Sequence, residues 1–227
     1  MLFKTFVINM DVFYYIISIS VGDSMIKNVF LKKSIKLIQR YHLNYNKEQE
    51  QFIRYGLEAI YLSLIKLIPI LFFAFVLGLF KESILFLVFY TLLRFFGFGL
   101  HSNNGYICFI SSAIVFLLLP YLSKIIEINL YLKVFITIFC FFCFLLYSPA
   151  DTKKRPIINK KKRLLAKIIS TSILSIYIIL IFVLKNNVMV NILIFAMLTE
   201  TIIIHPLTYK FFKMPYNNYI SYNKSVV

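Results

Sequence analysis

The feature that most constrains this chain is a series of six apolar runs, each 14 residues or longer, separated by short polar segments. A helix satisfies its backbone hydrogen bonds internally, and about 20 apolar residues of helix cross the hydrocarbon core of a bilayer. The runs are continuous and do not alternate with a period of two, which excludes a membrane β-barrel. Only 15% of the 227 residues are charged, against about a quarter in soluble domains. We therefore predict an all-α, polytopic membrane bundle.

The apolar runs and their flanks give the expected elements. The six spans are Leu67–Phe80, Ile84–Leu100, Tyr106–Ser123, Leu130–Tyr147, Ile168–Leu184 and Val188–His205. The first is short, but it can gain length from helical residues in Phe52–Lys66. Lys27–Leu43 combines apolar residues at helical spacing with Lys and Arg, which predicts an amphipathic interfacial helix on an anionic leaflet. Asn44–Gln51 is predicted to be a polar connector.

The chain divides into three parts. Residues 1–24 are interpreted as an N-terminal extension, because Met25 follows directly and opens the basic amphipathic helix. Residues 25–205 form the membrane domain. Residues 206–227 are predicted to be a polar cytoplasmic tail.

Lys and Arg predict the orientation. The loop Lys153–Lys167 carries eight of them, the region Lys27–Arg54 seven and the tail three, whereas each of three alternate loops carries one Lys. Lys and Arg accumulate on the cytoplasmic side of membrane proteins. Six spans satisfy this rule and place the loop after Leu100 on the cytoplasmic side. The net charge of +16 is thus attributed to topology and anionic lipid, and not to nucleic acid.

The stretch Arg94–Cys108 is a polar, Gly-bearing break between two apolar runs. It carries His101 and Cys108, and an imidazole can activate a thiol as a nucleophile. Seven residues of straight helix would separate the two by roughly 10.5 Å. Catalysis by this pair therefore requires a bend, and Asn103-Asn104-Gly105 has the composition of a turn. The alternative is that Cys108 is a small core hydrophobe and His101 an interfacial residue.

Two charged residues, Arg94 and Glu58, have two interpretations each. Arg94 either stabilises substrate charge or an oxyanion, or it forms a structural ion pair or binds lipid phosphate. Glu58 is the only acid in the apolar stretch 57–65. It either orients the His101 imidazole or is a core carboxyl, neutral or paired with Lys.

No cofactor is expected. His42, His101 and His205 are far apart in sequence, without metal-ligand spacing. Cys140 and Cys143 have C-x-x-C spacing but lie in an all-apolar run, so we predict that they pack in the core. Asp151 is interpreted as a turn residue after Pro149.

Two stretches together resemble the accessory gene regulator protein B (AgrB) family. The first is Arg94, Gly99, His101 and Cys108, which matches the family's pattern and its His-to-Cys interval. The second is Tyr147–Ile157, YSPADTKKRPI, which is similar to the family's segment opening a basic loop. Tyr55–Glu58 also looks like a family position where Gln or Glu occurs. The resemblance covers roughly residues 25–205.

The resemblance implies a cysteine endopeptidase of quorum sensing. Such a protease removes the C-terminal part of a small AgrD-like propeptide and promotes thiolactone formation of a cyclic autoinducing peptide. Cys108 would be the nucleophile and His101 the general base, with Arg94, Gly99 and Glu58 in support. Phe95, Phe96, Phe98 and Phe109 are expected to wall the site. A homodimer is implied as well. The alternatives are a peptide exporter without proteolysis and a structural or lipid-binding module.

Overall fold

The computed structural model describes residues 24–41, 47–100, 105–152 and 157–220. Within this part the chain forms α-helices and no β-strand. The helices are α2 (Ser24–Tyr41), α3 (Lys47–Val76), α4 (Phe80–Gly97), α5 (Gly105–Ile125), α6 (Leu130–Tyr147), α7 (Lys160–Val183), α8 (Asn187–Ile204) and α9 (Pro206–Phe211). The N-terminal extension 1–24 lies outside the described residues except for Ser24, and so do His101 and the predicted turn at Asn103-Asn104.

Five described helices are long and apolar enough to cross a membrane, and they lie in α3, α5, α6, α7 and α8. The sixth expected span corresponds to α4, an 18-residue helix that carries three charged residues, Lys81, Glu82 and Arg94. The prediction of an all-α, multi-pass membrane protein is confirmed. The expected interfacial segment does form a helix, α2.

Two boundaries differ from the prediction. Residues 47–51 are not a connector, because α3 is continuous over 30 residues from Lys47. This long helix also supplies the length that the short first span lacked. Helix α4 begins at Phe80 and not at Ile84, so Lys81 and Glu82 lie in its first turn. An acidic side chain in that position interacts favourably with the helix dipole, which explains why the helix extends beyond the apolar run.

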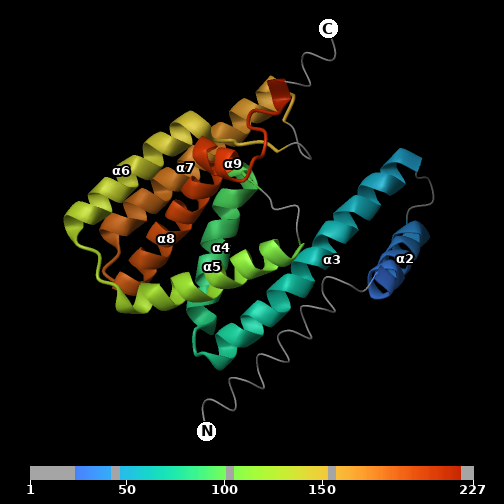
Figure 1. Ribbon diagram of the computed structural model, residues 1–227, viewed down its shortest axis with the longest axis horizontal. Coiled ribbons are helices and arrows are strands. Elements are labelled where there is room, and N and C mark those ends of the chain that lie inside the picture. Colours follow the sequence, from blue (N-terminus) through green and yellow to red (C-terminus); the bar gives the residue numbers. More distant parts are fainter. Residues whose placement is uncertain (1–23, 42–46, 101–104, 153–156, 221–227) are drawn as a thin grey trace.

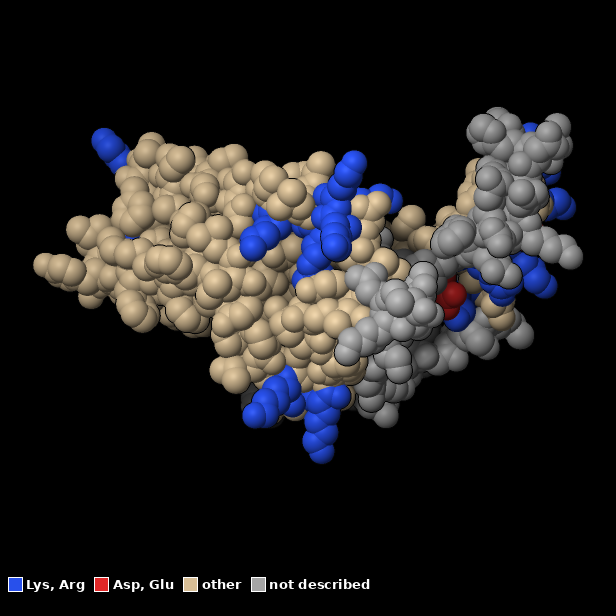
Figure 2. Space-filling model, turned by 90° about the horizontal axis from the view of Figure 1, so that it is seen from above, with Lys and Arg blue, Asp and Glu red and all other residues tan. Residues whose placement is uncertain are grey.

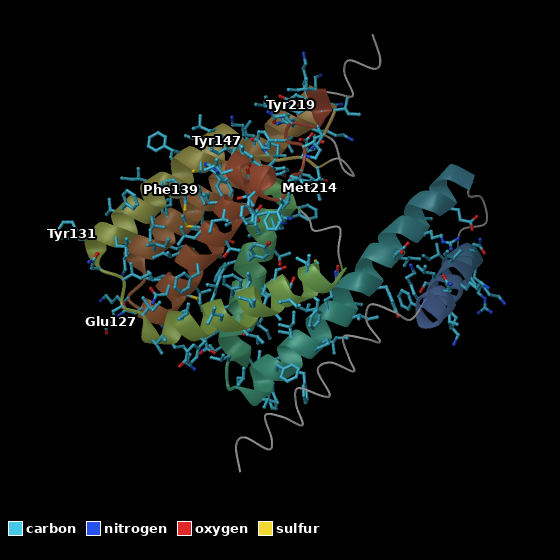
Figure 3. All side chains as sticks on the ribbon, in the orientation of Figure 1. Glu127, Tyr131, Phe139, Tyr147, Met214 and Tyr219 are labelled. Carbon is cyan, nitrogen blue, oxygen red and sulfur yellow. The ribbon has the colours of Figure 1, made fainter. Side chains whose placement is uncertain are left out.

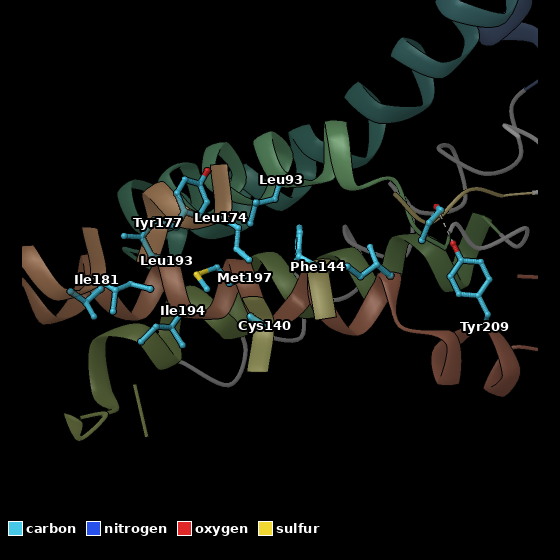
Figure 4. Packing of buried hydrophobic residues seen from close by; sticks show 13 residues of the cluster. Leu93, Cys140, Phe144, Leu174, Tyr177, Ile181, Leu193, Ile194, Met197 and Tyr209 are labelled. Atoms are coloured by element: carbon cyan, nitrogen blue, oxygen red, sulfur yellow. Dashed lines mark hydrogen bonds between the residues drawn. The ribbon is translucent and has the colours of Figure 1, made fainter. Parts of the chain in front are cut away.

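Helix α8 is the centre of the bundle. It packs against α4, α5, α6 and α7, and eleven of its 18 residues are buried. A helix that is apolar on all sides is expected to be surrounded by others. Figure 1 shows α6, α7 and α8 side by side, and Figure 4 shows Leu193, Ile194 and Met197 packed against the neighbouring helices. Cys140 and Cys143 are both buried, so the predicted core role of these two cysteines is confirmed.

The bundle has two ends, which we name by a charged residue at each. At the Lys124 end, Lys124 pairs with Glu82 at 3.4 Å. The amide of Asn191 there donates to the carbonyls of Ser123 and Ile126, and so joins α8 to the end of α5. At the Arg94 end, α4, α6 and α8 terminate, α7 begins and α9 packs. Figure 3 labels Glu127 and Tyr131 toward the first end and Tyr147, Met214 and Tyr219 toward the second.

Helices α2 and α3 form a separate arm. The first half of α3 extends away from the bundle and pairs with α2, while its second half packs against α4 and α5 (Figure 1). The rings of Phe30 and Tyr61 contact each other across the arm at 5.1 Å, and Leu31 is buried in it.

The outer surface is largely apolar. On α6, Tyr131, Phe135 and Leu146 are exposed by 67% or more. Figure 2 shows a face that is mostly uncharged, with Lys and Arg gathered in a few places. Such an extent of exposed apolar side chains matches a lipid-facing belt.

Candidate functional site

A non-helical segment separates α4 from α5. Helix α4 ends at Gly97, residues 98–100 are not helical, and α5 is described from Gly105 onward. The bend between His101 and Cys108 that catalysis by the pair requires stays a prediction. His101 itself lies outside the described residues, so its distance to the thiol stays a prediction.

Cys108 is a free, half-buried thiol in the first turn of α5. Its Sγ accepts a hydrogen bond from Nζ of Lys66, at 3.4 Å, across from α3. Its backbone carbonyl accepts hydrogen bonds from the hydroxyls of Ser111 at 3.1 Å and Ser112 at 2.7 Å. The thiol therefore faces a cation, and it is more accessible than the two core cysteines.

A small apolar cluster lies beside the thiol. Phe109 is fully buried and packs with Ile70 and Ala113 between α3 and α5. We expected Phe109 to form part of the wall of the site, but its side chain is buried and fixes α5 against α3. Its role is to hold Cys108 opposite Lys66.

Arg94 organises the chain that leads into His101. Its Nη1 donates to the carbonyl of Phe98, and its Nη2 donates to the carbonyls of Gly99, at 3.2 Å, and Leu100. These three carbonyls directly precede His101 in sequence. The planar guanidinium presents several donors in a fixed arrangement, which suits it to hold a tightly curved segment. Of the two interpretations of Arg94, the geometry matches the structural one.

Glu200 of α8 completes this arrangement. Its carboxylate is fully buried, and its Oε2 lies 3.6 Å from Nη1 of Arg94. No sequence pattern connects these two residues, which lie on different helices. An acid within an apolar span was the only available signal, because such residues are expensive and face the protein interior.

Gly99 is required by two independent features. Its backbone has φ of +96°, in the region that favours glycine. A Cβ at this position would lie 2.5 Å from Nη1 of Arg94 and 2.8 Å from Cγ2 of Ile203. Only glycine permits the guanidinium to approach the backbone this closely. This explains physically why glycine stands at the position singled out in the sequence.

The two sequence motifs meet in space. The Gly99 amide donates to the carbonyl of Ala150 at 2.6 Å, and the Ala150 amide donates to the carbonyl of Gly97 at 3.0 Å, so that Phe98 and Ala150 form an isolated bridge. The Leu100 amide donates to the carbonyl of Ile203 at 3.4 Å. The segment 97–100 is therefore fixed on both sides before the chain reaches His101.

Asp151 does more than make a turn. Its buried carboxylate accepts backbone hydrogen bonds from Asn218, at 3.1 Å, and Tyr219, at 2.9 Å. Arg163 lies 3.8 Å from the same carboxylate and stacks on the Tyr219 ring at 3.7 Å. Asp151 thus joins the region after α9 to the second motif, and residues 206–220 fold against the bundle.

Tyr209 of α9 reinforces this junction. Its hydroxyl donates to the carbonyls of Ala150, at 3.2 Å, and Asp151, at 3.3 Å. Burial raises the pKa of this phenol well above its usual value. The neutral phenol is therefore the form that the fold favours.

A pocket of about 340 Å³ opens at the Arg94 end between α4 and α7. Its lining combines aromatic rings with two ammonium groups; the residues are Phe95, Phe96, Phe98, Lys161, Lys162, Leu165 and Ala166. Three of the four Phe residues expected to wall the site line this pocket, but Cys108 does not, so their role as walls of the catalytic site stays a prediction.

Glu58 pairs with Lys27. Its Oε1 lies 2.7 Å from Nζ of Lys27, and both side chains are about one-third exposed. This matches the alternative of a carboxyl paired with Lys. Its orientation of His101 stays a prediction, because His101 is outside the described residues.

Within the described part of the chain, no cluster of three His, Cys, Asp or Glu side chains could hold a metal ion. The structure brings together the Cys108 thiol and the Lys66 ammonium, and the sequence has one imidazole, that of His101, seven residues before Cys108. That set is suited to nucleophilic attack on a carbonyl carbon followed by proton transfer.

These features define a polytopic helical membrane protein with a half-buried thiol on α5 and a fixed, Gly-containing turn after α4. Residues 31–204 match the family model "Accessory gene regulator B", and the chain belongs to the AgrB family.

Relatives support the assignment over most of the chain. An AgrB-like protein of Clostridium acetobutylicum is 27% identical over 174 residues, which cover 77% of this chain and 83% of the relative. An AgrB-like protein of Listeria monocytogenes is 31% identical over 173 residues, covering 75% and 83%. A second clostridial relative, from Clostridium perfringens, is 30% identical over 142 residues, covering 60% and 66%. No solved structure matches.

Proposed function

We propose that this protein is a membrane cysteine endopeptidase of an agr quorum-sensing system. It cleaves the C-terminal part from a small AgrD-like propeptide and promotes closure of the remaining peptide into a thiolactone. The observation that carries the proposal is the half-buried Cys108 thiol in the first turn of α5, separated by a break in the helix from the segment that leads into His101. Family membership supports the peptide substrate.

In the proposed first step, His101 as general base takes the proton of the Cys108 thiol, and the sulfur attacks the carbonyl carbon of the scissile peptide bond. A tetrahedral oxyanion forms and collapses, the C–N bond breaks, and His101 in its protonated form gives a proton to the leaving amine. The product is an acyl thioester on Cys108. The propeptide's own cysteine then attacks this thioester, which releases Cys108 and closes the ring.

Thioester exchange is close to even in energy, so the fate of the acyl group depends on the surroundings of the site. Water must be excluded and the second thiol held near the thioester. The buried cluster of Ile70, Phe109 and Ala113, which includes the residue next to Cys108, supports the exclusion of water. The site lies on the cytoplasmic side of the cell membrane, where a newly made propeptide is available and reducing conditions keep the thiol free.

Co-expression with the propeptide tests the proposal. Cys108→Ala and His101→Ala abolish processing, while both variants still insert into the membrane at wild-type amounts. Cys143→Ala is the matched control, because it removes a thiol that lies in the core; it leaves processing intact. Normal processing by Cys108→Ala would refute the proposal. Appearance of uncleaved propeptide outside the cell would favour an exporter instead.

A further inference from the structure

The contact between Lys66 and Cys108 is the strongest unassigned feature of the site. Lys66 lies in the middle of α3, 42 residues before Cys108, and its Nζ lies 3.4 Å from Sγ. Both residues are half-buried. Within the described part of the chain, Lys66 forms no salt bridge with a carboxylate. The partner that the structure gives this ammonium group is sulfur.

The surroundings of the pair strengthen the interaction between charges. The buried cluster of Ile70, Phe109 and Ala113 lies immediately beside it, since Ile70 follows Lys66 by one helical turn and Phe109 follows Cys108 directly. Apolar surroundings lower the local dielectric and make an uncompensated charge costly. A neutral thiol compensates an ammonium poorly, whereas a thiolate compensates it well.

The position of Cys108 on its helix acts in the same direction. Cys108 is the fourth residue of α5, which begins at Gly105. The N-terminus of a helix carries a partial positive charge, which favours an anion in the first turn. The ammonium and the helix therefore both stabilise negative charge on the same sulfur.

We propose that Lys66 is a catalytic residue whose ammonium group stabilises negative charge on the Cys108 sulfur. The inference rests on the proposed endopeptidase function and assigns a further residue to it. The thiolate attacks the peptide carbonyl and forms the C–S bond, while the carbonyl electron pair moves to oxygen. When this oxyanion collapses, the C–N bond breaks and the amine takes its proton from the His101 imidazolium. The imidazolium forms when His101 takes the thiol proton before the attack, so in the cleavage step itself His101 acts only as the acid.

Lys66 also assists the second step. The propeptide thiolate attacks the thioester carbon, and Cys108 must leave as a thiolate. A thiol whose anion is stabilised leaves faster in thiol exchange. The same ammonium therefore promotes attack by Cys108 in cleavage and its departure in ring closure, which favours the thiolactone over a stalled acyl-enzyme.

Ionisation of the thiol can be measured without any substrate. The full chain carrying Cys140→Ala and Cys143→Ala is purified in lipid nanodiscs, so that Cys108 is the single thiol, and its rate of alkylation by iodoacetamide is followed against pH. Lys66→Met shifts the midpoint of this profile upward by about one pH unit or more and lowers the rate at neutral pH about tenfold. Lys66→Arg restores the profile.

Lys133→Met is the matched control, because it removes a half-buried Lys from α6 without touching the thiol. It leaves the midpoint unchanged. If Lys66→Met fails to assemble, Lys66→Gln removes the charge and keeps a polar side chain. An unchanged midpoint in a folded neutral variant overturns the inference.

Processing assays separate this inference from the function on which it rests. Lys66→Met lowers the cleavage rate at pH 7 and regains much of it at higher pH, whereas Cys108→Ala has no activity at any pH. Loss of processing in Cys108→Ala with unchanged alkylation in Lys66→Met would leave the endopeptidase standing with His101 as the base. Processing by Cys108→Ala would refute the proposed endopeptidase function, while the alkylation profile would still measure the effect of Lys66 on the ionisation of the Cys108 thiol.

Discussion

The segment that leads into His101 and the helical turn that carries Cys108 are held in different ways. Residues 97–100 bond to Ala150, to Ile203 and to the Arg94 guanidinium, and they sit on the bundle around α8. Cys108 lies instead where α5 packs against α3, and a smaller buried cluster joins these two helices. One half of the site is fixed by the core, and the other is supported by the arm.

This difference bears on the proposed catalytic function. A catalytic group requires precise placement, and the hydrogen-bonded segment 97–100 ends directly before His101 in the sequence. The contact between α3 and α5 rests on a smaller set of buried residues, and regions with few buried apolar contacts have a lower local stability. The predictions below test whether the segment 97–100 is as rigid as its contacts indicate.

The largest effect is expected from breaking the buried ion pair. Arg94→Met leaves the Glu200 carboxylate buried without its partner, which lowers the free energy of unfolding by about 3–5 kcal/mol. The double variant Arg94→Met with Glu200→Leu recovers most of this stability, because no buried charge remains. Thermal unfolding in detergent measures both.

Processing assays separate the two roles of Arg94, which are its ion pair with Glu200 and its hydrogen bonds to the carbonyls of residues 98–100. The double variant still lacks the donors that hold the carbonyls of Phe98, Gly99 and Leu100, so it processes propeptide poorly although it is folded. Wild-type processing by a stable double variant would contradict the role of the guanidinium in placing His101.

A smaller effect is expected at Gly99, and Gly78 provides the control. Both glycines have positive φ, but a Cβ on Gly78 meets nothing within 4 Å, whereas one on Gly99 meets Arg94 and Ile203 at less than 3 Å. Gly78→Ala therefore costs only the backbone term of about 1 kcal/mol and keeps full processing. Gly99→Ala costs more and loses processing. Equal losses of stability and activity in the two variants would show that the close approach of Arg94 is unimportant.

The next effect concerns the junction of α9 with the second motif. Tyr209→Phe removes the hydroxyl that bonds to Ala150 and Asp151, which lowers the free energy of unfolding by about 1 kcal/mol. Tyr131→Phe, at an exposed position, leaves stability unchanged. Chemical denaturation of the two variants in parallel provides the comparison.

The same residue gives a pH dependence. Because burial raises the pKa of Tyr209, the folded protein keeps the phenolic proton at pH values where the unfolded chain has released it. The contribution to stability is complete below about pH 10, the usual pKa of tyrosine, and is lost as the pH rises through the raised pKa. Tyr209→Phe lacks this alkaline loss, and a wild-type-like alkaline profile in that variant would assign the titration to another group.

The sequence predicted the membrane bundle because apolar length and Lys/Arg distribution are local properties that need no knowledge of packing. It likewise marked Cys108, Gly99 and Arg94. It missed the residues whose role depends on which helices become neighbours. Lys66 and Glu200 are ordinary single charges in their own spans; only the packing of α3 on α5, and of α8 on α4, gives them partners.

Asp151 illustrates the same limit. Its position after Pro149 predicted a turn residue. In the structure its carboxylate binds the backbone amides of Asn218 and Tyr219, which are almost 70 residues away in the sequence. The tail was predicted from its polarity, whereas its attachment depends on backbone amides, which every sequence contains. A pattern of side chains carries no information about them.

The smallest effect on stability is expected at the Lys27–Glu58 pair, which belongs to the arm. Both side chains are partly exposed, and such pairs contribute about 0–1 kcal/mol, so Glu58→Gln barely changes the unfolding temperature. Its effect on catalysis decides between the two interpretations of this residue. If Glu58 only joins α2 to α3, then Lys27→Met and Glu58→Gln have the same small effect on processing. If Glu58 orients His101, then Glu58→Gln alone lowers the rate of cleavage, and the arm belongs to the catalytic site.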